Sequence, residues 1–540
     1  MASSSFLLLV LYSTLLYSSS ARSLPRSDGV DGGCDGLRRR ASSEAKCAYL
    51  VFQTHECSPE GYINYLRLFY CVFGGYPALG YLSLFLWLVL LFYLLGNTAA
   101  DYFCSNLAGL SRLLNLHPTV AGVTLLSLGN GAPDVFSSVV SFAGTSSSAS
   151  LVGLNSVLGG AFFVSTVVVG VVSICVAPRK VSVDRSCFMR DVLFLLFVLL
   201  VLLAILSFRT INVWSAVAFA GLYLAYVFLV SMTHVYGRHK DHVNVSSLLP
   251  LKASAELAAP LLAGTENSGG GEGKQSTCGC IASRTLRLLE LPLYLPRRLT
   301  IPVVTEERWS KPFAVASVTL APTLLVALWD SKEAAKLGSK ERTLVYLFGA
   351  STGTLLGIST ALGTDRESPP TRLLLPWLAG GFLMSVSWTY ITAQELVSLL
   401  VSAGFILDMS PSVLGLTVLA WGNSLGDLVA NVAVAVGGGA GGAQVAVSGC
   451  YGGPIFNTLV GLGASLALAS WARYPTSVDI PRDPTLFVTV GFLVAGLLWA
   501  LVVLPRRGMK PDRVLGVGLI AIYLCFLCVR LGQSLGLVEL

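Results

Sequence analysis

Charged residues are scarce in this sequence. Asp, Glu, Lys and Arg together make up 12% of its 540 residues, whereas a soluble domain carries about 25%. A soluble chain of this length needs more charge to cover its surface, so the composition excludes a cytosolic enzyme, a nucleic-acid-binding protein and a disordered scaffold. The hydrophobic content of 54% instead predicts an all-α integral membrane protein that is surrounded by membrane lipid.

The first 21 residues contain no Lys or Arg. The apolar run at 6–16 is too short to span a bilayer, and small residues follow it at 18–21. This pattern is typical of a secretory signal peptide, whereas a mitochondrial presequence is rich in Arg. We therefore expect residues 1–21 to direct the chain to a secretory-pathway membrane, such as that of the vacuole, the endoplasmic reticulum or the cell surface, rather than to the mitochondrial inner membrane.

Cysteines gather in the polar segment that follows, at 22–76. Four of the 12 cysteines of the chain lie in this segment. Four cysteines after a signal peptide predict two disulfides in a lumenal, oxidising compartment, and the spacing leaves all three pairings open. The four residues are Cys34, Cys47, Cys57 and Cys71.

Twelve stretches are apolar and long enough to span a bilayer as helices, which requires about 20 residues. Five lie in a first half at 77–233 and seven in a second half at 312–540, on either side of a polar loop at 234–311. Basic residues in the 177–189 and 506–513 connections predict that these connections and the loop are cytosolic. The expected spans are 77–96, 118–142, 150–176, 190–208, 212–233, 312–330, 343–363, 373–404, 411–436, 445–471, 486–505 and 513–536.

The two halves share an internal repeat. Residues 118–139 (PTVAGVTLLSLGNGAPDVFSSV) match 411–432 (PSVLGLTVLAWGNSLGDLVANV) without a gap, and nine of the 22 positions are identical. The similarity extends over 98–170 and 392–463. Seven spans separate the starts of the two copies, and because seven is odd, the copies cross the membrane in opposite directions. This predicts inverted-topology repeats, the architecture of many secondary transporters that bind substrate near the membrane midplane.

Each copy of the repeat places one acid in the middle of a span, Asp134 or Asp427. A charge at that depth costs at least about 2.5–3.5 kcal/mol and needs compensation. Asn130 and Asn423 each precede the acid by four residues, which puts amide and carboxylate on one helix face. Glycines and Pro133 next to the acids weaken both helices, and an interrupted helix frees backbone carbonyls. This set of oxygens predicts a metal site for a hard cation: Ca²⁺, Na⁺ or K⁺.

One position breaks the symmetry of the repeat. Asn457 in the second copy aligns with Val164 in the first, and each lies 30 residues after its acid. An amide can coordinate a cation and valine cannot, so we expect Asn457 to be a further ligand. With both acids ionised the site carries a charge of −2, which balances one Ca²⁺ or two monovalent ions.

Three other interpretations use the same two acids. They could form a structural polar contact in which one Asp is protonated. A cation channel would need an open pore lined by carbonyls or charges, whereas one acid in each inverted copy favours a closed, alternating site. An intramembrane aspartyl protease also needs two acids, but known families pair Tyr-Asp with Gly-x-Gly-Asp. Here the sequences are Pro-Asp at 133–134 and Ser-Leu-Gly-Asp at 424–427.

The motifs GNGAPD (129–134) and GNSLGD (422–427) resemble the two α-repeats of the cation/calcium exchanger superfamily. Within it, the chain is most similar to the plant cation/calcium exchangers and the mitochondrial sodium/calcium/lithium exchanger. The resemblance implies that Asp134 and Asp427 coordinate the transported ions, with no cofactor and no enzymatic activity. It also implies an antiporter that exchanges Ca²⁺, K⁺ or Na⁺ against Na⁺, K⁺ or H⁺ by alternating access.

The sequence departs from this family at one of two hydroxyl positions. Sodium/calcium exchangers usually have a hydroxyl residue three positions before each acid. Ser424 supplies one of them and is an expected cation ligand, but Gly131 has no side chain. The usual ratio of Na⁺ to Ca²⁺ in the family is therefore not implied for this chain.

The broken symmetry at Val164 can be tested by restoring it. We expect Val164→Asn to change the ion selectivity of transport, because it adds an oxygen ligand at the position that matches Asn457. The measurement is tracer uptake with Ca²⁺, Na⁺ and K⁺ in competition. Unchanged selectivity would show that this position does not face the ions.

Overall fold

The structure is a computed structural model that describes most of the chain outside the N-terminus and the central loop. The predicted signal peptide (1–21), most of the predicted loop (234–311), Cys34 and Cys57 lie outside the described residues. The described residues are 37, 40, 42–52, 61–106, 109, 127–143, 147–179, 181–208, 210–238, 294–305, 308–333, 339–366, 368–370, 374–437, 439–479 and 484–534.

The described residues are mainly helical, as the sequence predicts. Eleven helices are long and apolar enough to cross a membrane, and they match eleven of the twelve predicted spans. The twelfth, at 118–142, is described only from Ser127, where helix α8 begins. In the first half the elements are α5 (Pro77–Thr98), η2 (Ala99–Cys104), α8 (Ser127–Ala143), α9 (Ser147–Phe163), η4 (Val164–Val168), α10 (Val169–Val176), η5 (Ala177–Arg179), α11 (Arg185–Phe208), β1 (Thr210–Ile211) and α12 (Val213–Arg238).

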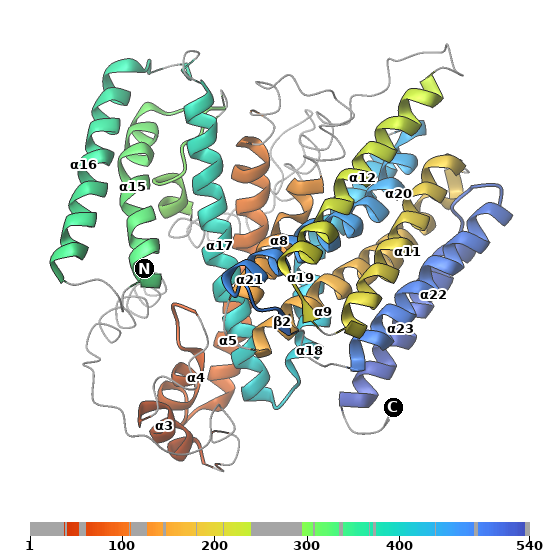
Figure 1. Ribbon diagram of the computed structural model, residues 1–540, viewed down its shortest axis with the longest axis horizontal. Coiled ribbons are helices and arrows are strands. Elements are labelled where there is room, and N and C mark those ends of the chain that lie inside the picture. The colour runs from red at the N-terminus through yellow and green to blue at the C-terminus, as the bar shows by residue number, and fades with distance from the viewer. Residues whose placement is uncertain are drawn as a thin grey trace, which may run out of the picture.

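The second half has a similar succession of long helices after an additional helical hairpin. The hairpin consists of α15 and α16, and Figure 1 shows it standing beside α17 at the edge of the molecule. The elements are α15 (Lys311–Glu333), α16 (Ser339–Gly363), α17 (Leu374–Leu407), α18 (Pro411–Leu414), η7 (Gly415–Leu419), α19 (Ala420–Gly437), α20 (Gly439–Phe456), η8 (Asn457–Leu462), α21 (Gly463–Ala472), β2 (Val478–Asp479), α22 (Pro484–Arg506) and α23 (Arg513–Ser534).

The two copies of the repeat contact each other in a reciprocal pattern. Helix α8 of the first copy packs against η8 and α21 of the second, and α19 of the second packs against η4 and α10 of the first. The π-helical segments η4 and η8 begin at Val164 and Asn457, which are equivalent positions of the repeat. The strands β1 and β2 add a short antiparallel pair in which Thr210 faces Asp479.

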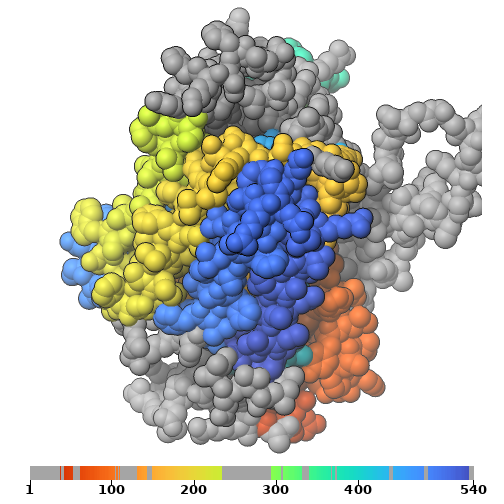
Figure 2. Space-filling view, turned by 90° about the vertical axis from the view of Figure 1, so that its right-hand side faces the viewer, coloured from red at the N-terminus to blue at the C-terminus, as the bar shows by residue number. Residues whose placement is uncertain are grey.

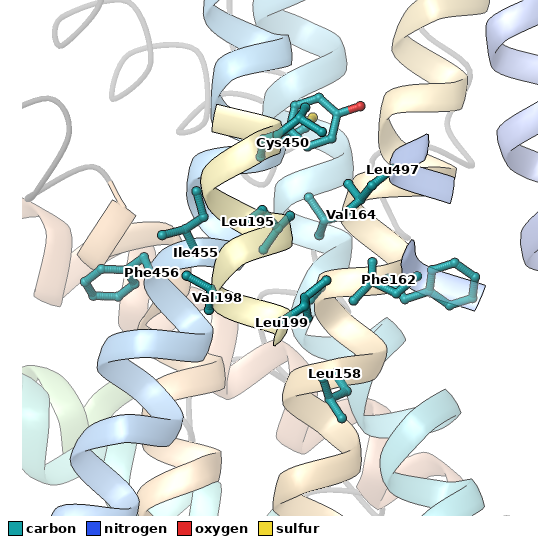
Figure 3. Close-up of a cluster of buried hydrophobic side chains, with 14 of the residues drawn as sticks. Leu158, Phe162, Val164, Leu195, Val198, Leu199, Cys450, Ile455, Phe456 and Leu497 are labelled. Atoms are coloured by element: carbon teal, nitrogen blue, oxygen red, sulfur yellow. The ribbon is translucent and has the colours of Figure 1, made fainter. Parts of the chain in front are cut away.

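A large apolar core joins the repeats to the peripheral helices. It contains buried side chains from α9, α11, α20, α22 and α23. Figure 3 shows part of it, where Leu158 and Phe162 of α9 lie near Leu195 and Leu199 of α11. In Figure 2 the yellow helices α11 and α12 and the blue C-terminal helices cover one face of the molecule. The core therefore holds the repeats from one side of the bundle.

A small N-terminal head packs on the other side. It comprises α3 (Ser43–Phe52), α4 (Tyr65–Arg67) and η1 (Leu68–Val72) and lies below α5 and α17 in Figure 1. A disulfide joins Cys47 and Cys71, which is one of the bridges that the sequence left open. The head shares a second apolar core with α5, α17 and the ends of α8 and α9.

The repeats cross at two glycines that allow backbones to touch. A Cβ atom at Gly159 of α9 would lie 2.5 Å from the carbonyl oxygen of Leu416. A Cβ atom at Gly415 of η7 would meet the backbone of Val152 in α9 in the same way. Close crossings of this kind are typical of small residues in membrane helices.

This crossing can be tested with a single methyl group. We expect Gly159→Ala to lower the free energy of unfolding by about 1–3 kcal/mol, the usual cost of overpacking, because two backbones must move apart. The measurement is thermal unfolding of the purified protein in detergent. Gly221→Ala in α12 is the control, because a Cβ atom there meets nothing within 4 Å. An equal effect of the two substitutions would contradict the crossing.

Candidate cation-binding site

Four elements from the two repeats meet around Asp134. Asp134 comes from α8, Asn423 and Ser424 from α19, and Asn457 begins η8. All four side chains are buried, and that of Asp134 is 3% exposed. Gly160 of α9 closes the group, because a Cβ atom there would lie 3.3 Å from Ser424 Oγ and 3.6 Å from Asp134 Oδ2. The structure thus brings together four of the six predicted site residues.

Two amides hold the Asp134 carboxylate. Asn423 Nδ2 donates to Oδ1 at 2.9 Å, and Asn457 Nδ2 donates to Oδ2 at 2.6 Å. Both donors come from the second repeat, so the bonds tie the two repeats together. Hydrogen bonds to an ionised carboxylate contribute about 1.5–3 kcal/mol each, which offsets part of the cost of burying the charge.

Asn423 bonds an acid of the other repeat. Helical spacing places Asn423 on one face with Asp427, but its amide nitrogen donates to Asp134. The partner of this amide comes from a helix that packs against α19, and spacing along α19 does not identify it. The side chain of Asn130, the equivalent of Asn423, lies outside the described residues, so its role stays a prediction.

Asp427 has a more open environment than Asp134. Asp427 is partly exposed, whereas Asp134 is buried. Its backbone carbonyl accepts a hydrogen bond from Asn431 Nδ2 at 2.8 Å. A Cβ atom at Gly453, the equivalent of Gly160, would meet no described atom within 4 Å. The two acids are therefore alike in sequence but different in packing.

Three buried oxygen atoms at the site accept no hydrogen bond among the described residues. They are Asn423 Oδ1, Asn457 Oδ1 and Ser424 Oγ. Buried acceptors without partners are costly unless something binds them. Rotating either amide would exchange its nitrogen for its oxygen, so the same residues can offer donors to Asp134 or oxygens to a cation. Carboxylate, amide and hydroxyl oxygens are ligands of Ca²⁺, and alkali cations also bind oxygen.

The helices that carry the acids are not interrupted at the predicted place. α8 continues as an α-helix through Gly129, Gly131 and Pro133, and α19 does so through Gly422 and Gly426. The expectation of a break there was wrong. The irregular hydrogen bonding falls instead in the π-helical segments η4, η7 and η8, and such segments are frequent at functional sites. Pro133 still lacks an N–H group, so one carbonyl of α8 has no helical partner.

Gly131 provides the space for Asn457. A Cβ atom at Gly131 would collide with Asn457 Oδ1 and would lie 2.9 Å from the ring of Phe456. Gly131 occupies the position that Ser424 has in the second copy, and Asn457 occupies the position that Val164 has in the first copy. Gly131 and Asn457 therefore face each other in the structure. The missing side chain at Gly131 thus provides the space that the amide of Asn457 occupies.

Val164 contributes to apolar packing. It is 3% exposed and belongs to the large core, and Figure 3 shows it near Leu195 and Leu497. An amide introduced at this position would therefore be buried among aliphatic side chains.

Several serines near Asp134 were not predicted. Ser137 Oγ lies 3.3 Å from Asn423 Nδ2, and Ser465 Oγ donates to Ser138 Oγ at 3.0 Å. Ser137 and Ser138 follow Asp134 by three and four residues, so helical spacing places them on its face. That spacing was the signal that could have identified them. In the described residues, no group of three or more His, Cys, Asp or Glu side chains surrounds a common point.

Comparison with known proteins decides the family. The model of the family described as sodium/calcium exchanger protein matches residues 84–232 and 377–532. The chain belongs to this family. The two matched ranges contain both copies of the repeat and leave out the α15–α16 hairpin. Its members are membrane transporters and not enzymes, so the protease interpretation falls away.

Individual relatives match over nearly the whole chain. Cation/calcium exchanger 1 of Arabidopsis thaliana is 50% identical over 95% of this chain and 90% of its own length. Cation/calcium exchanger 2 of the same plant is 48% identical over 98% and 96%. The mitochondrial sodium/calcium exchanger protein of Rattus norvegicus is 32% identical over 91% and 88%. A solved structure of the sodium-calcium exchanger NCX_Mj aligns over 83% of this chain and 98% of its own at 16% identity, with a TM-score of 0.36, too low for the sites to be compared.

The space at Gly131 gives a prediction for the site. We expect Gly131→Ala to reduce cation transport by at least about tenfold, because the new Cβ atom pushes Asn457 away from Asp134 and removes a hydrogen bond to a charged group. Gly426→Ala, next to Asp427, should transport normally because a Cβ atom there meets nothing within 4 Å. The measurement is initial-rate tracer uptake into liposomes. Normal transport by the Gly131 variant would mean that the Asn457–Asp134 contact has no part in it.

Proposed function

We propose that this chain is a secondary active antiporter that moves Ca²⁺ across a membrane in exchange for Na⁺, K⁺ or H⁺. Its family membership supports cation/calcium exchange in general. The transported ions would bind between Asp134 and Asp427, together with Asn130, Asn423, Ser424 and Asn457.

The observation that carries this proposal is the environment of Asp134. Among the described residues, this buried carboxylate accepts hydrogen bonds from two amide groups, and three unpartnered oxygens lie beside it. Among the described residues no Lys, Arg or His forms an ion pair with either aspartate. A cation that enters such a site is attracted by the negative charge of the acids, whereas an anion would be repelled.

Alternating access is the mechanism that the repeats favour. Each ligand of Asp134 comes from the opposite repeat, so the site exists only while α8, α19 and η8 remain in contact. Moving one repeat relative to the other would open the site on one face of the membrane and then on the other. Bound cations stabilise the closed contact because they bridge oxygens from both repeats. The exchange of one ion for another would follow from this coupling.

We assign the protein to a membrane of the secretory pathway. The Cys47–Cys71 disulfide supports this assignment, because disulfides persist in oxidising compartments. The head would then face the lumen or the cell exterior.

The test is calcium uptake into liposomes that contain the purified protein. They are loaded in turn with Na⁺, K⁺ or an acidic buffer, and ⁴⁵Ca²⁺ uptake is followed. Uptake that requires one internal cation would establish exchange and identify the counter-ion. Uptake with no internal cation requirement would indicate a channel. Absence of Ca²⁺ uptake under every gradient, with the protein folded, would contradict calcium exchange and point to monovalent cations.

The two acids can be tested in the same assay. We expect Asp134→Asn and Asp427→Asn to abolish exchange while leaving membrane insertion intact, because Asn costs less to bury than Asp. Asp330→Asn is the matched control, since Asp330 pairs with Arg342 in the α15–α16 hairpin, outside the repeats. If either repeat variant exchanged normally, the proposed site would be wrong.

A further inference from the structure

A third buried acid lies outside the proposed site. Glu395 is 6% exposed and lies in α17, well before its end at Leu407. Its position corresponds, with a shift of one residue, to Asp101 in the first copy of the repeat. Glu395 therefore lies within the helix and not at its end.

The N-terminal head supplies the partners of Glu395. The backbone N–H of Tyr62 donates to Oε1, and the Tyr65 hydroxyl donates to Oε2 at 2.6 Å. Trp87 Nε1 of α5 donates to the same hydroxyl at 2.9 Å, which fixes its orientation. Burial raises the pKa of Tyr65 well above its usual value, so the hydroxyl keeps its proton and remains a donor.

The contact is tight and is supported covalently. A Cβ atom at Gly61 would collide with Ser398 of α17, so the head backbone lies directly on this helix. The Cys47–Cys71 disulfide ties η1, which follows Tyr65 and Arg67 along the chain, back to α3. The donors of Glu395 therefore belong to a cross-linked segment that is held outside the bundle.

Helix α17, which contacts the head, also packs against α8, the helix that carries Asp134. Phe382 and Val386 of α17 pack against a small apolar cluster that contains Ala132, two residues before Asp134. Near the other end, Leu396 and Leu400 share a core with Val140 of α8. A shift of α17 would therefore change the packing on both sides of Asp134.

The equivalent acid in the first half, Asp101, is also held by side-chain contacts, but these include an ion pair with an arginine. Asp101 accepts from Asn97 Nδ2 at 2.7 Å and pairs with Arg308 at 3.3 Å. Arg297 donates to Asn97 Oδ1 and to Thr98 Oγ1. Asp101 lies roughly 35 Å along α5 and η2 from the end of α5 near the head, given a rise of about 1.5 Å per residue. The two helices that precede the acid-bearing spans are thus each tied through one acid, toward opposite ends of the bundle.

We propose that the segment Gly61–Val72, closed by the Cys47–Cys71 disulfide, is a latch that holds α17 against α8 through Tyr65 and Glu395. Tyr65 is then a positioning residue, because it acts on the ions through α17. This inference rests on the proposed exchange function. Opening the site toward the face of the head requires α17 to leave the latch, so the latch sets how often that conformation is populated.

The expected effect is confined to one face of the membrane. Tyr65→Phe keeps the ring and removes the hydroxyl, and Glu395→Gln keeps the size and removes the charge. A weaker latch populates the conformation open to the head, so the Ca²⁺ concentration for half-maximal uptake from that face should fall about tenfold. The value for the opposite face should rise or stay unchanged. Uptake is measured in vesicles whose orientation is fixed by the accessibility of the head to protease.

Two comparisons separate the latch from a general loss of structure. Tyr70→Phe is the matched control, because it removes a hydroxyl from the same segment that is not bonded to Glu395. The double variant Tyr65→Phe/Glu395→Gln should equal the stronger single variant, since both substitutions act on one contact. Additive effects, or equal shifts on both faces, would overturn the latch.

A second measurement does not depend on transport. Deuterium uptake by the peptide that covers residues 61–68 should increase in Tyr65→Phe and Glu395→Gln and remain low in Tyr70→Phe. Asp134→Asn should leave it low even though exchange is lost, so failure of the proposed function can be distinguished from failure of the latch. Unchanged uptake in both latch variants would overturn the proposal whatever the transport assay gives.

Discussion

The structure depends on one constraint, the burial of a carboxylate between two halves of a membrane protein. Asp134 is buried, and its hydrogen-bond donors come from α19 and η8 of the other repeat. Because both donors come from the second repeat, the contact that holds Asp134 exists only while the two repeats are packed together. Separating the repeats would leave the buried carboxylate without these donors, which is energetically costly. In the proposed function, a bound cation would take their place.

The same constraint explains how the repeats differ. Around Asp134 the packing is close, since Gly131 and Gly160 leave space only for Asn457 and Ser424. Around Asp427, Gly453, the equivalent of Gly160, faces open space, and the acid is partly exposed. A duplicated sequence would by itself produce two equal halves. The observed inequality means that one acid is held by protein groups in this conformation while the other is accessible.

The sequence predicts the helices and the pair of acids well, because both signals are local. Apolar runs report the spans directly, and the matching G-N-x-x-x-D motifs identify Asp134 and Asp427 without any knowledge of packing. The partner of Asn423 could not be read in this way, because spacing along a helix says nothing about which helix crosses it. The π-helical segments and the bonds from the head to Glu395 were missed for the same reason. Both arise from contacts between segments that lie far apart in the chain.

The α15–α16 hairpin has a consequence for how this architecture could have arisen. Within the described part of the chain its two helices pack mainly on each other, with Gly353 of α16 against the backbone of Thr319, and the family match does not include them. Because a hairpin crosses the membrane twice, gaining or losing it leaves the second repeat in the same orientation. An insertion of a single span would have turned that repeat over and removed Asn423 and Asn457 from Asp134. Only paired additions between the halves are compatible with the site.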